Sequence, residues 1–259
     1  MQVLRLVVVL VTALLAARDV RESTADHGPP EPAQQLEQEF FALELAGPAN
    51  SAAPQSVGLA VWRRRLGEHG AQCEWELRFK EHDTRVQHVE RELEHARELV
   101  WREWRPGSGR TLHADRAAGS SVLSIVEWGR AQGLRMQLEG PGAVAFPLEV
   151  LERLRRGEWN AGELAVFDPL SRSIEAWRVE TTTTAPTVDD QTRGVAPLRH
   201  VELRRVDGTS AGSYDFRGTE LTSFRWQNGA LTARRISADE HARAASELVQ
   251  VASIDATTR

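Results

Sequence analysis

The stretch FPLEVLERLRRGEWNAGELAVFDPLS, Phe146–Ser171, decides the fold because it predicts a single short helix inside a chain of predicted strands. Pro147 suits the first turn of a helix, where its missing N–H would be unpaired in any case. An apolar stripe at helical spacing follows, made of Leu148, Val150, Leu151 and Leu154. The charged residues of this segment are expected to face away from the core: Glu152, Arg153, Arg155 and Arg156. Gly157 marks the helix end, and Asp168-Pro169 predicts a turn after the strand ELAVF.

Predicted strands lie on both sides of this helix. Segments of roughly seven to ten residues, rich in β-branched and aromatic side chains, recur between turn signals. SSVLSIVEW and LRMQLE alternate before the helix, and SIEAWRVE and TELTSFRW follow it. Asp207-Gly208 and Asn228-Gly229 predict two-residue hairpin turns with positive φ at both central positions. Ser237 and Glu240 form a capping box that opens a closing helix.

The fold class predicted from these patterns is mainly β, a β-rich α+β protein with two or three helices. Two arrangements fit: one long curved antiparallel sheet, or half-barrel, with helices in its concave side, and a sandwich of two sheets. The segment RVQHVERELEHARELVW, starting at Arg85, fits either a helix or a hairpin. We favour the hairpin, with strands over Arg85–Leu93 and Glu98–Arg105, because LVWREW is followed by PGSG and RTL.

The chain divides by composition into a leader, a linker and one domain. Residues 1–25 have the layout of a secretory signal peptide, with Arg5, an apolar run from Leu6 to Leu15 and small residues after it. Cleavage after Ala17 or after Ala25 fits, and an uncleaved anchor is the rival interpretation. Residues 26–56 are interpreted as a linker with a short amphipathic segment, 57–250 as a single antiparallel β-rich domain, and 251–259 as a tail. We expect no stable transmembrane span after cleavage.

The composition excludes some classes of function. The 259 residues are 41% hydrophobic and 27% charged, as in a soluble globular protein. The net charge of −5 argues against nucleic acid as a partner, because phosphate binding requires excess Lys and Arg. Cys73 is the single cysteine, so no intramolecular disulfide can form. Alternation places Cys73 on one face with Trp75 and Leu77, which predicts a buried, inert thiol.

No pattern of residues identifies a cofactor, a metal site or a catalytic group. His82, His88 and His95 lie in an acidic region, but their spacing matches no ligand motif. If this region is a strand, His88, Glu90 and Glu92 share a face; we interpret that face as solvated and charged rather than as a site. Glu158 and Asp168 are the best carboxylate pair for a glycoside-type hydrolase, and a structural role in turns is preferred for both.

The tryptophans are the most informative residues for binding. The sequence has 8 Trp and 1 Tyr, and most Trp lie on predicted strands. Core packing is the default role of each, but a wide apolar concave face would also need such side chains. The candidate binding residues are Trp101, Trp128, Trp177 and Trp226.

The order of predicted elements resembles that of the half-barrel envelope proteins of Gram-negative bacteria, a group that includes lipoprotein carriers. The resemblance rests on LVWREWRPGSGRTL, on the Phe146–Ser171 stretch and on GTELTSFRWQNGALTARRIS, and it spans Val57 to Ile236. It implies helices that cover the open side of a curved sheet and a cavity that takes up acyl chains.

We therefore expect an exported, non-enzymatic protein of the cell envelope, periplasmic or extracellular. Its expected partner is a lipid or other apolar ligand, or another envelope protein. The alternatives are a hydrolase of envelope polymers that uses paired carboxylates and a purely structural interaction module.

Overall fold

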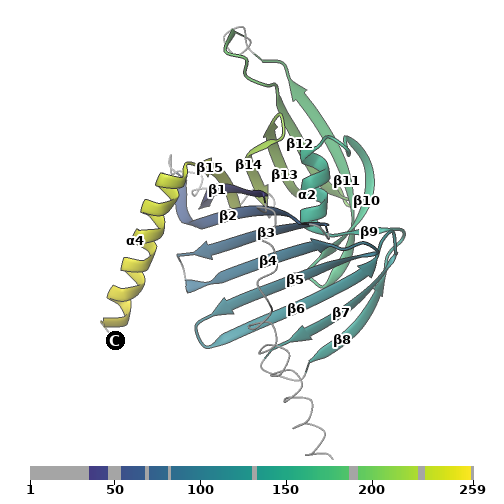
Figure 1. Ribbon diagram of the computed structural model, residues 1–259, viewed down its shortest axis with the longest axis horizontal. Coiled ribbons are helices and arrows are strands. Elements are labelled where there is room, and N and C mark those ends of the chain that lie inside the picture. The colour runs from purple at the N-terminus through teal and green to yellow at the C-terminus, as the bar shows by residue number, and fades with distance from the viewer. Residues whose placement is uncertain are drawn as a thin grey trace, which may run out of the picture. The chain divides into compact units, whose positions relative to one another are not determined.

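The computed structural model describes residues 35–45, 54–67, 70–80, 83–129, 133–186, 192–226 and 231–257. They belong to one compact unit, Gln35–Arg259. Fifteen strands form one open sheet, in which β1 takes the middle position and β8 and β9 take the two ends (Figure 1). All neighbouring strands are antiparallel except β9 and β10. The prediction of a mainly β fold is confirmed. Of the two predicted arrangements, a curved sheet and a sandwich, the structure shows the single curved sheet.

The first wing of the sheet is a meander that runs outward from the middle strand. Its strands are β1 (Gln35–Leu45), β2 (Gln55–Gly67), β3 (Gly70–Phe79), β4 (Arg85–Glu92), β5 (Ala96–Arg105), β6 (Ser108–Ala117), β7 (Val122–Trp128) and β8 (Leu134–Glu139). Each pairs with the next in sequence. The hairpin β4–β5 confirms the interpretation preferred for this segment over a helix.

The second wing starts at the far edge and returns to β1. It contains β9 (Val144–Ala145), α2 (Pro147–Arg155), β10 (Ala161–Asp168), β11 (Ser173–Thr184), β12 (Leu198–Arg205), β13 (Ser210–Arg217), β14 (Glu220–Trp226) and β15 (Leu231–Ile236). The last helix is α4 (Ala238–Thr257), which packs on β1 and β2. No helix in the described part of the chain is both long and apolar enough to span a membrane.

The core lies on one face of the sheet, which we call the inner face; the other is the outer face. Cross-strand partners point to the same side, so the pairs Trp62–Trp75 and Trp75–His88 place all three residues on the inner face. α2 lies against this face, between the two wings (Figure 1). Its stripe of Leu148, Val150, Leu151 and Leu154 is buried, as the sequence predicted. The core therefore forms where the curved sheet surrounds α2.

The two ends of the sheet come close together without joining in a ladder. The N–H of Val144, in β9, donates to the carbonyl of Ser120, which precedes β7, at 3.1 Å. Arg172, in the turn after β10, pairs with Glu127 of β7 at 2.6 Å. These contacts hold the wings around α2.

The start and end of α2 follow the predicted signals. Pro147 occupies the first helical position. Gly157 has a φ of 71°, the left-handed conformation that ends many helices. Its N–H donates to the carbonyl of Leu154, and the N–H of Glu158 donates to that of Arg153, both at 3.0 Å. This pattern is a Schellman motif, and it turns the chain toward β10.

The boundaries predicted for the domain differ from those observed. The segment assigned to the 26–56 linker contains β1, so the sheet begins at Gln35 rather than at 57. The predicted 251–259 tail overlaps α4, which continues to Thr257. The signal peptide predicted for 1–25 lies outside the described residues.

The hairpin at Asp207-Gly208 has a different turn from the one predicted. Gly208 has a φ of 83°, whereas Asp207 is not among the positive-φ residues. The N–H of Gly208 donates to the carbonyl of Arg205, and the N–H of Arg205 donates to that of Thr209. A wider turn with one left-handed glycine therefore replaces the two-residue turn. The turn predicted at Asn228-Gly229 falls outside the described residues.

Candidate functional site

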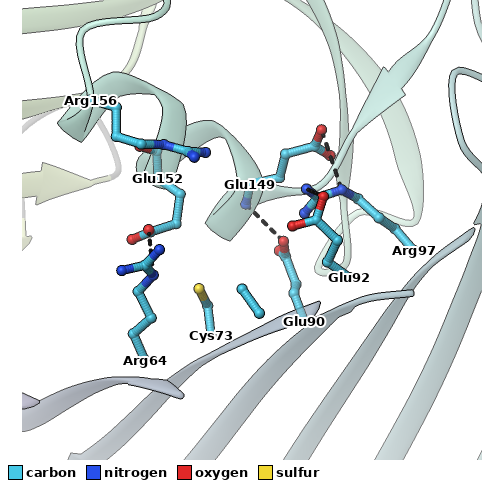
Figure 2. A pocket seen from close by; sticks show the side chains of 9 residues that line it. Arg64, Cys73, Glu90, Glu92, Arg97, Glu149, Glu152 and Arg156 are labelled. Carbon is cyan, nitrogen blue, oxygen red and sulfur yellow. Dashed lines mark hydrogen bonds and ion pairs between the residues drawn. The ribbon is translucent and has the colours of Figure 1, made fainter. Parts of the chain in front are cut away.

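A small polar cavity lies between α2 and the inner face of the first wing (Figure 2). Its volume is about 40 Å³, enough for about two or three water molecules. The lining residues are Arg64, Ala71, Cys73, Glu90, Glu92, Arg97, Glu149, Glu152 and Arg156. The cavity is therefore lined mainly by charged side chains from β2 to β5 and from α2.

Glu90, on β4, caps the N-terminus of α2 across the cavity. One carboxylate oxygen accepts the N–H of Leu148 at 2.7 Å. The other accepts the N–H of Glu149 at 2.8 Å (Figure 2). These N–H groups have no partner within the helix, and the helix dipole favours a negative charge at this position. Nε2 of His88 lies 2.9 Å from the same carboxylate. Glu90 is only 3% exposed, so this cap joins α2 to the sheet inside the core.

Glu149, in the first turn of α2, makes further charged contacts. Its carboxylate accepts from Arg116 at 2.5 Å and from Arg153 at 2.8 Å, and Arg97 lies 3.6 Å away. It also accepts the N–H of Phe146 at 3.3 Å, which satisfies another free group at the start of the helix. Arg116 and Glu149 are both buried, so each is neutralised by a partner on a different element.

The other end of α2 forms ion pairs with β1 and β2. Arg155 donates to Glu39 of β1 at 2.8 Å and stacks over Trp62 at 4.1 Å. Glu152 lies 3.2 Å from Nε of Arg64 on β2. Burial raises the pKa of both Glu39 and Glu152, and this effect exceeds the opposing attraction of Arg155 in each case. We call the contacts of Glu39, Arg64, Glu90, Glu149, Glu152 and Arg155 the ionic clamp.

The chemistry available in this cavity is limited. Each lining carboxylate of the clamp already has an arginine or backbone partner. Burial is the main cause of the raised pKa of the Cys73 thiol, and repulsion from Glu152 and Glu90 raises it further. The thiolate is therefore strongly disfavoured. Within the described residues, no group of three or more His, Cys, Asp or Glu is arranged to hold a metal. The clamp holds the helix; the space beside it is too small for an acyl chain.

Two interpretations of charged residues were wrong. His88 and Glu90 share a face with Glu92, as predicted, but they are buried on the inner face rather than solvated. Glu152 and Arg155 point toward the sheet and not away from it, because the strands supply Arg64 and Glu39 as partners. His95 is exposed, and His82 lies outside the described residues.

The four predicted binding tryptophans do not form one set. Trp101 is buried on the inner face beside His88, with ring centroids 5.5 Å apart. Trp177 and Trp226 are half-buried and pack against the core. Trp128 pairs with Thr111, next to the inward-facing Leu112, so it lies on the outer face and is 50% exposed. Three of the four therefore face the core, and Trp128 does not.

Half-buried apolar residues lie at the end of the inner face away from α2. They are Val57, Phe79, Trp177, Ala211 and Trp226, which we call the apolar rim. The register places Phe79 at the end of β3, whereas Cys73 and the clamp lie near its start. Trp226 packs on Phe224 at 4.4 Å and on Trp75 at 6.2 Å, which connects the rim to the buried aromatic core. Apart from the two tryptophans, no local pattern indicates this rim, because its members come from five different strands.

The carboxylates considered for hydrolysis are not brought together. Glu158 precedes β10 and Asp168 ends it, so eight extended residues, roughly 25 Å, separate them. Asp168 accepts the N–H groups of Leu170 and Ser171, which fixes the turn after β10. Its preferred interpretation as a turn residue agrees with these bonds. Glu158 pairs with Arg156 at the surface.

No family model matches the chain, and no characterised protein or solved structure shows significant similarity to it.

Proposed function

We propose that the protein is an exported, non-enzymatic protein of the cell envelope that binds an apolar ligand, such as an acyl chain, at the apolar rim. The leader-like pattern of residues 1–25 supports export. The observation that carries the binding proposal is the continuity of half-exposed rim residues with the buried aromatic cluster of the inner face.

The aromatic cluster gives the rim its chemical character. The rings of Phe41, Trp75 and Phe224 pack in tilted and edge-to-face pairs with centroids within 5.4 Å of one another, and Trp226 extends the cluster toward solvent. Covering half-exposed aromatic and aliphatic surface with a hydrocarbon chain is favourable by roughly 25 cal/mol per Å². An apolar ligand would therefore gain most where Trp226 and Trp177 are still accessible.

The polar groups at the rim suit a ligand with an apolar body and a polar head. The indole N–H of Trp177 donates to Glu175 at 2.9 Å, and Arg205 donates to the same carboxylate at 2.9 Å. These bonds fix the Trp177 ring and leave a charged pair beside the apolar surface. A fatty acid or phospholipid could place its head group here while its chain covers the rim.

The arrangement of reactive groups supports binding over catalysis. The Cys73 thiol is buried with a raised pKa, and the carboxylates near it serve the ionic clamp. Glu158 and Asp168 lie at opposite ends of one strand, beyond the roughly 10 Å that a glycosidase pair spans.

Binding of a fluorescent fatty acid tests the proposal. We expect Trp226→Ala and Trp177→Ala to weaken binding roughly tenfold each, because each removes a large apolar contact. Trp104→Ala, on the outer face, is the matched control and should bind as the unchanged protein does. Circular dichroism of each variant checks that the sheet is intact.

Two results would contradict the proposal. One is the absence of bound lipid in an organic extract of the purified protein together with no response to the fluorescent fatty acid. The other is an equal effect of Trp104→Ala and Trp226→Ala, which would place binding elsewhere.

A further inference from the structure

The outer face of the first wing carries two exposed tryptophans, Trp104 on β5 and Trp128 on β7. They are 39% and 50% exposed, and no other Phe, Tyr or Trp of the described residues is as accessible. Trp104 follows the inward-facing Trp101 by three residues, and Trp128 follows the inward-facing Glu127, so both point outward. Exposed apolar side chains that gather on one face and are rimmed by polar residues mark interaction sites. This pair is not used by the core or by the apolar rim.

Arginines surround this pair on the same face. Arg85 lies directly opposite Trp104, with its guanidinium 5.3 Å from the ring centroid. Arg102 aligns with Trp128 through Thr111 on the strand between them. Arg135 is opposite Val126, two residues before Trp128. We call Arg85, Arg102, Trp104, Trp128 and Arg135 the outer patch.

The outer patch has an excess of positive charge. Arg85 pairs with Glu76 at 3.0 Å, but Arg102 donates only to the neutral Gln87, at 3.0 Å. Among the described carboxylates, none forms an ion pair with Arg102 or Arg135. The nearest acidic neighbours along the strands, Glu103 and Glu127, point to the inner face. The patch is therefore complementary to a surface that is both anionic and partly apolar.

We propose that the outer patch is a docking surface for an anionic lipid bilayer. Tryptophan rings prefer the depth of the lipid head groups, where an apolar body and a polar N–H are both satisfied. Arginines beside them would contact the phosphates, with a free-energy gain of the kind measured for basic side chains at anionic membranes. The patch spans five adjacent strands, β4 to β8, so it presents a broad surface rather than a pocket.

This inference goes beyond ligand binding at the apolar rim and does not depend on it. The two surfaces lie on opposite faces of the sheet, so docking through the outer patch leaves the inner face free. A protein with both could bind an apolar ligand while it rests on a membrane.

Cosedimentation with vesicles tests the proposal. The chain from Asp26 onward keeps the whole compact unit and omits the apolar leader, which would itself bind lipid. We expect binding to vesicles of phosphatidylcholine with phosphatidylglycerol, little binding to phosphatidylcholine alone, and weaker binding as salt is raised. Arg102→Ala and Arg135→Ala should each weaken binding about fivefold, and Trp104→Ala with Trp128→Ala roughly tenfold.

Matched variants separate this proposal from general effects of charge and fold. Arg225→Ala removes an exposed arginine from the outer face of the second wing and should bind vesicles normally. Trp226→Ala should also bind vesicles normally while it loses the fatty acid. If the unchanged protein binds vesicles but does not bind the fatty acid, the result counts against the apolar rim alone and leaves the outer patch standing.

Three outcomes would overturn the proposal. The first is equal binding to neutral and anionic vesicles, and the second is normal vesicle binding by the double tryptophan variant. The third is a dimer in sedimentation equilibrium that Trp128→Ala dissociates, in the absence of vesicle binding. That result would assign the outer patch to a second copy of this chain.

Discussion

The two ends of the inner face differ in the chemistry and the burial of their side chains. At the α2 end, charged side chains are buried and paired, and they hold a helix inside the sheet. At the other end, apolar side chains of the rim stay half-exposed. A buried charge and an exposed tryptophan both suggest a functional site by the usual criteria. The buried charges are explained by structure, because every clamp carboxylate has an arginine or backbone partner. The half-exposed apolar surface of the rim has no such structural explanation.

The largest effect is expected where the helix stripe meets the sheet. Leu154→Asp places a carboxylate at a fully buried position without a partner, and it should destabilise the fold by more than about 4 kcal/mol. Urea denaturation followed by circular dichroism measures this loss. Leu170→Asp changes an exposed leucine in the same way and should cost little. A stable, cooperatively folding Leu154→Asp protein would show that α2 is not part of the core.

Removal of the helix cap should have the next largest effect. Glu90→Ala leaves the N–H groups of Leu148 and Glu149 unpaired in the core, at a cost of about 2–4 kcal/mol. Asp168→Asn is the control: the Asp168 side chain also accepts two backbone N–H groups, but in an exposed turn, where the amide oxygen can keep one bond and water can satisfy the other N–H. It should cost under about 0.5 kcal/mol. Equal losses in the two variants would remove the distinction between cap and turn.

The ionic clamp should give a characteristic dependence on pH. Burial raises the pKa of Glu39 in the folded protein, so the folded state holds this proton more tightly than the unfolded state does. The contribution of Glu39 to stability is therefore largest below the unfolded pKa and decreases as pH rises through the folded pKa. The stability difference between the unchanged protein and Glu39→Gln should decrease as pH is raised above about 4.5. Urea denaturation at several pH values measures it.

Glu76, on the outer face, should show the opposite trend. Burial alone would raise its pKa, but hydrogen bonds from Arg63 and Arg78 lower it overall. Its contribution is therefore present above the unfolded pKa and is lost as pH falls through the folded pKa. The stability difference between the unchanged protein and Glu76→Gln should grow as pH rises toward neutrality. If the stability differences of Glu39→Gln and Glu76→Gln changed with pH in the same direction, the opposite pKa shifts of Glu39 and Glu76 would be contradicted.

Local patterns predicted much of the fold. Pro147, the apolar stripe and Gly157 determine α2 within a few residues, so its position could be predicted from the sequence. The β4–β5 hairpin was also predicted from a local pattern, because LVWREW is followed by the turn signal PGSG and by RTL. β1 was missed because both of its faces mix polar and apolar residues: Glu39 and Phe41 face inward, while Phe40 faces outward against His241 of α4. Helix α4, which covers Phe40, lies at the other end of the described chain, so no pattern near β1 indicates that Phe40 is covered.

The candidate sites depended on pairings that the sequence does not show. Glu90 and Leu148 are 58 residues apart, so the cap could not be distinguished from a solvated acidic strand. Trp128 and Trp226 lie on strands with similar alternation, yet one faces outward and the other inward. The direction of each depends on the register of its neighbours, and only the assembled sheet sets that register.

The middle position of β1 has a consequence for how the chain folds. β1 pairs with β2 nearby in sequence and with β15, whose Ile236 lies opposite Phe40. The first wing can form by local hairpins, but one edge of β1 stays open until the last strand has been made. Such distant pairing slows folding and leaves an unpaired strand edge that can join other chains. We therefore expect truncation before β15 to leave one edge of β1 open and to give a first wing that aggregates.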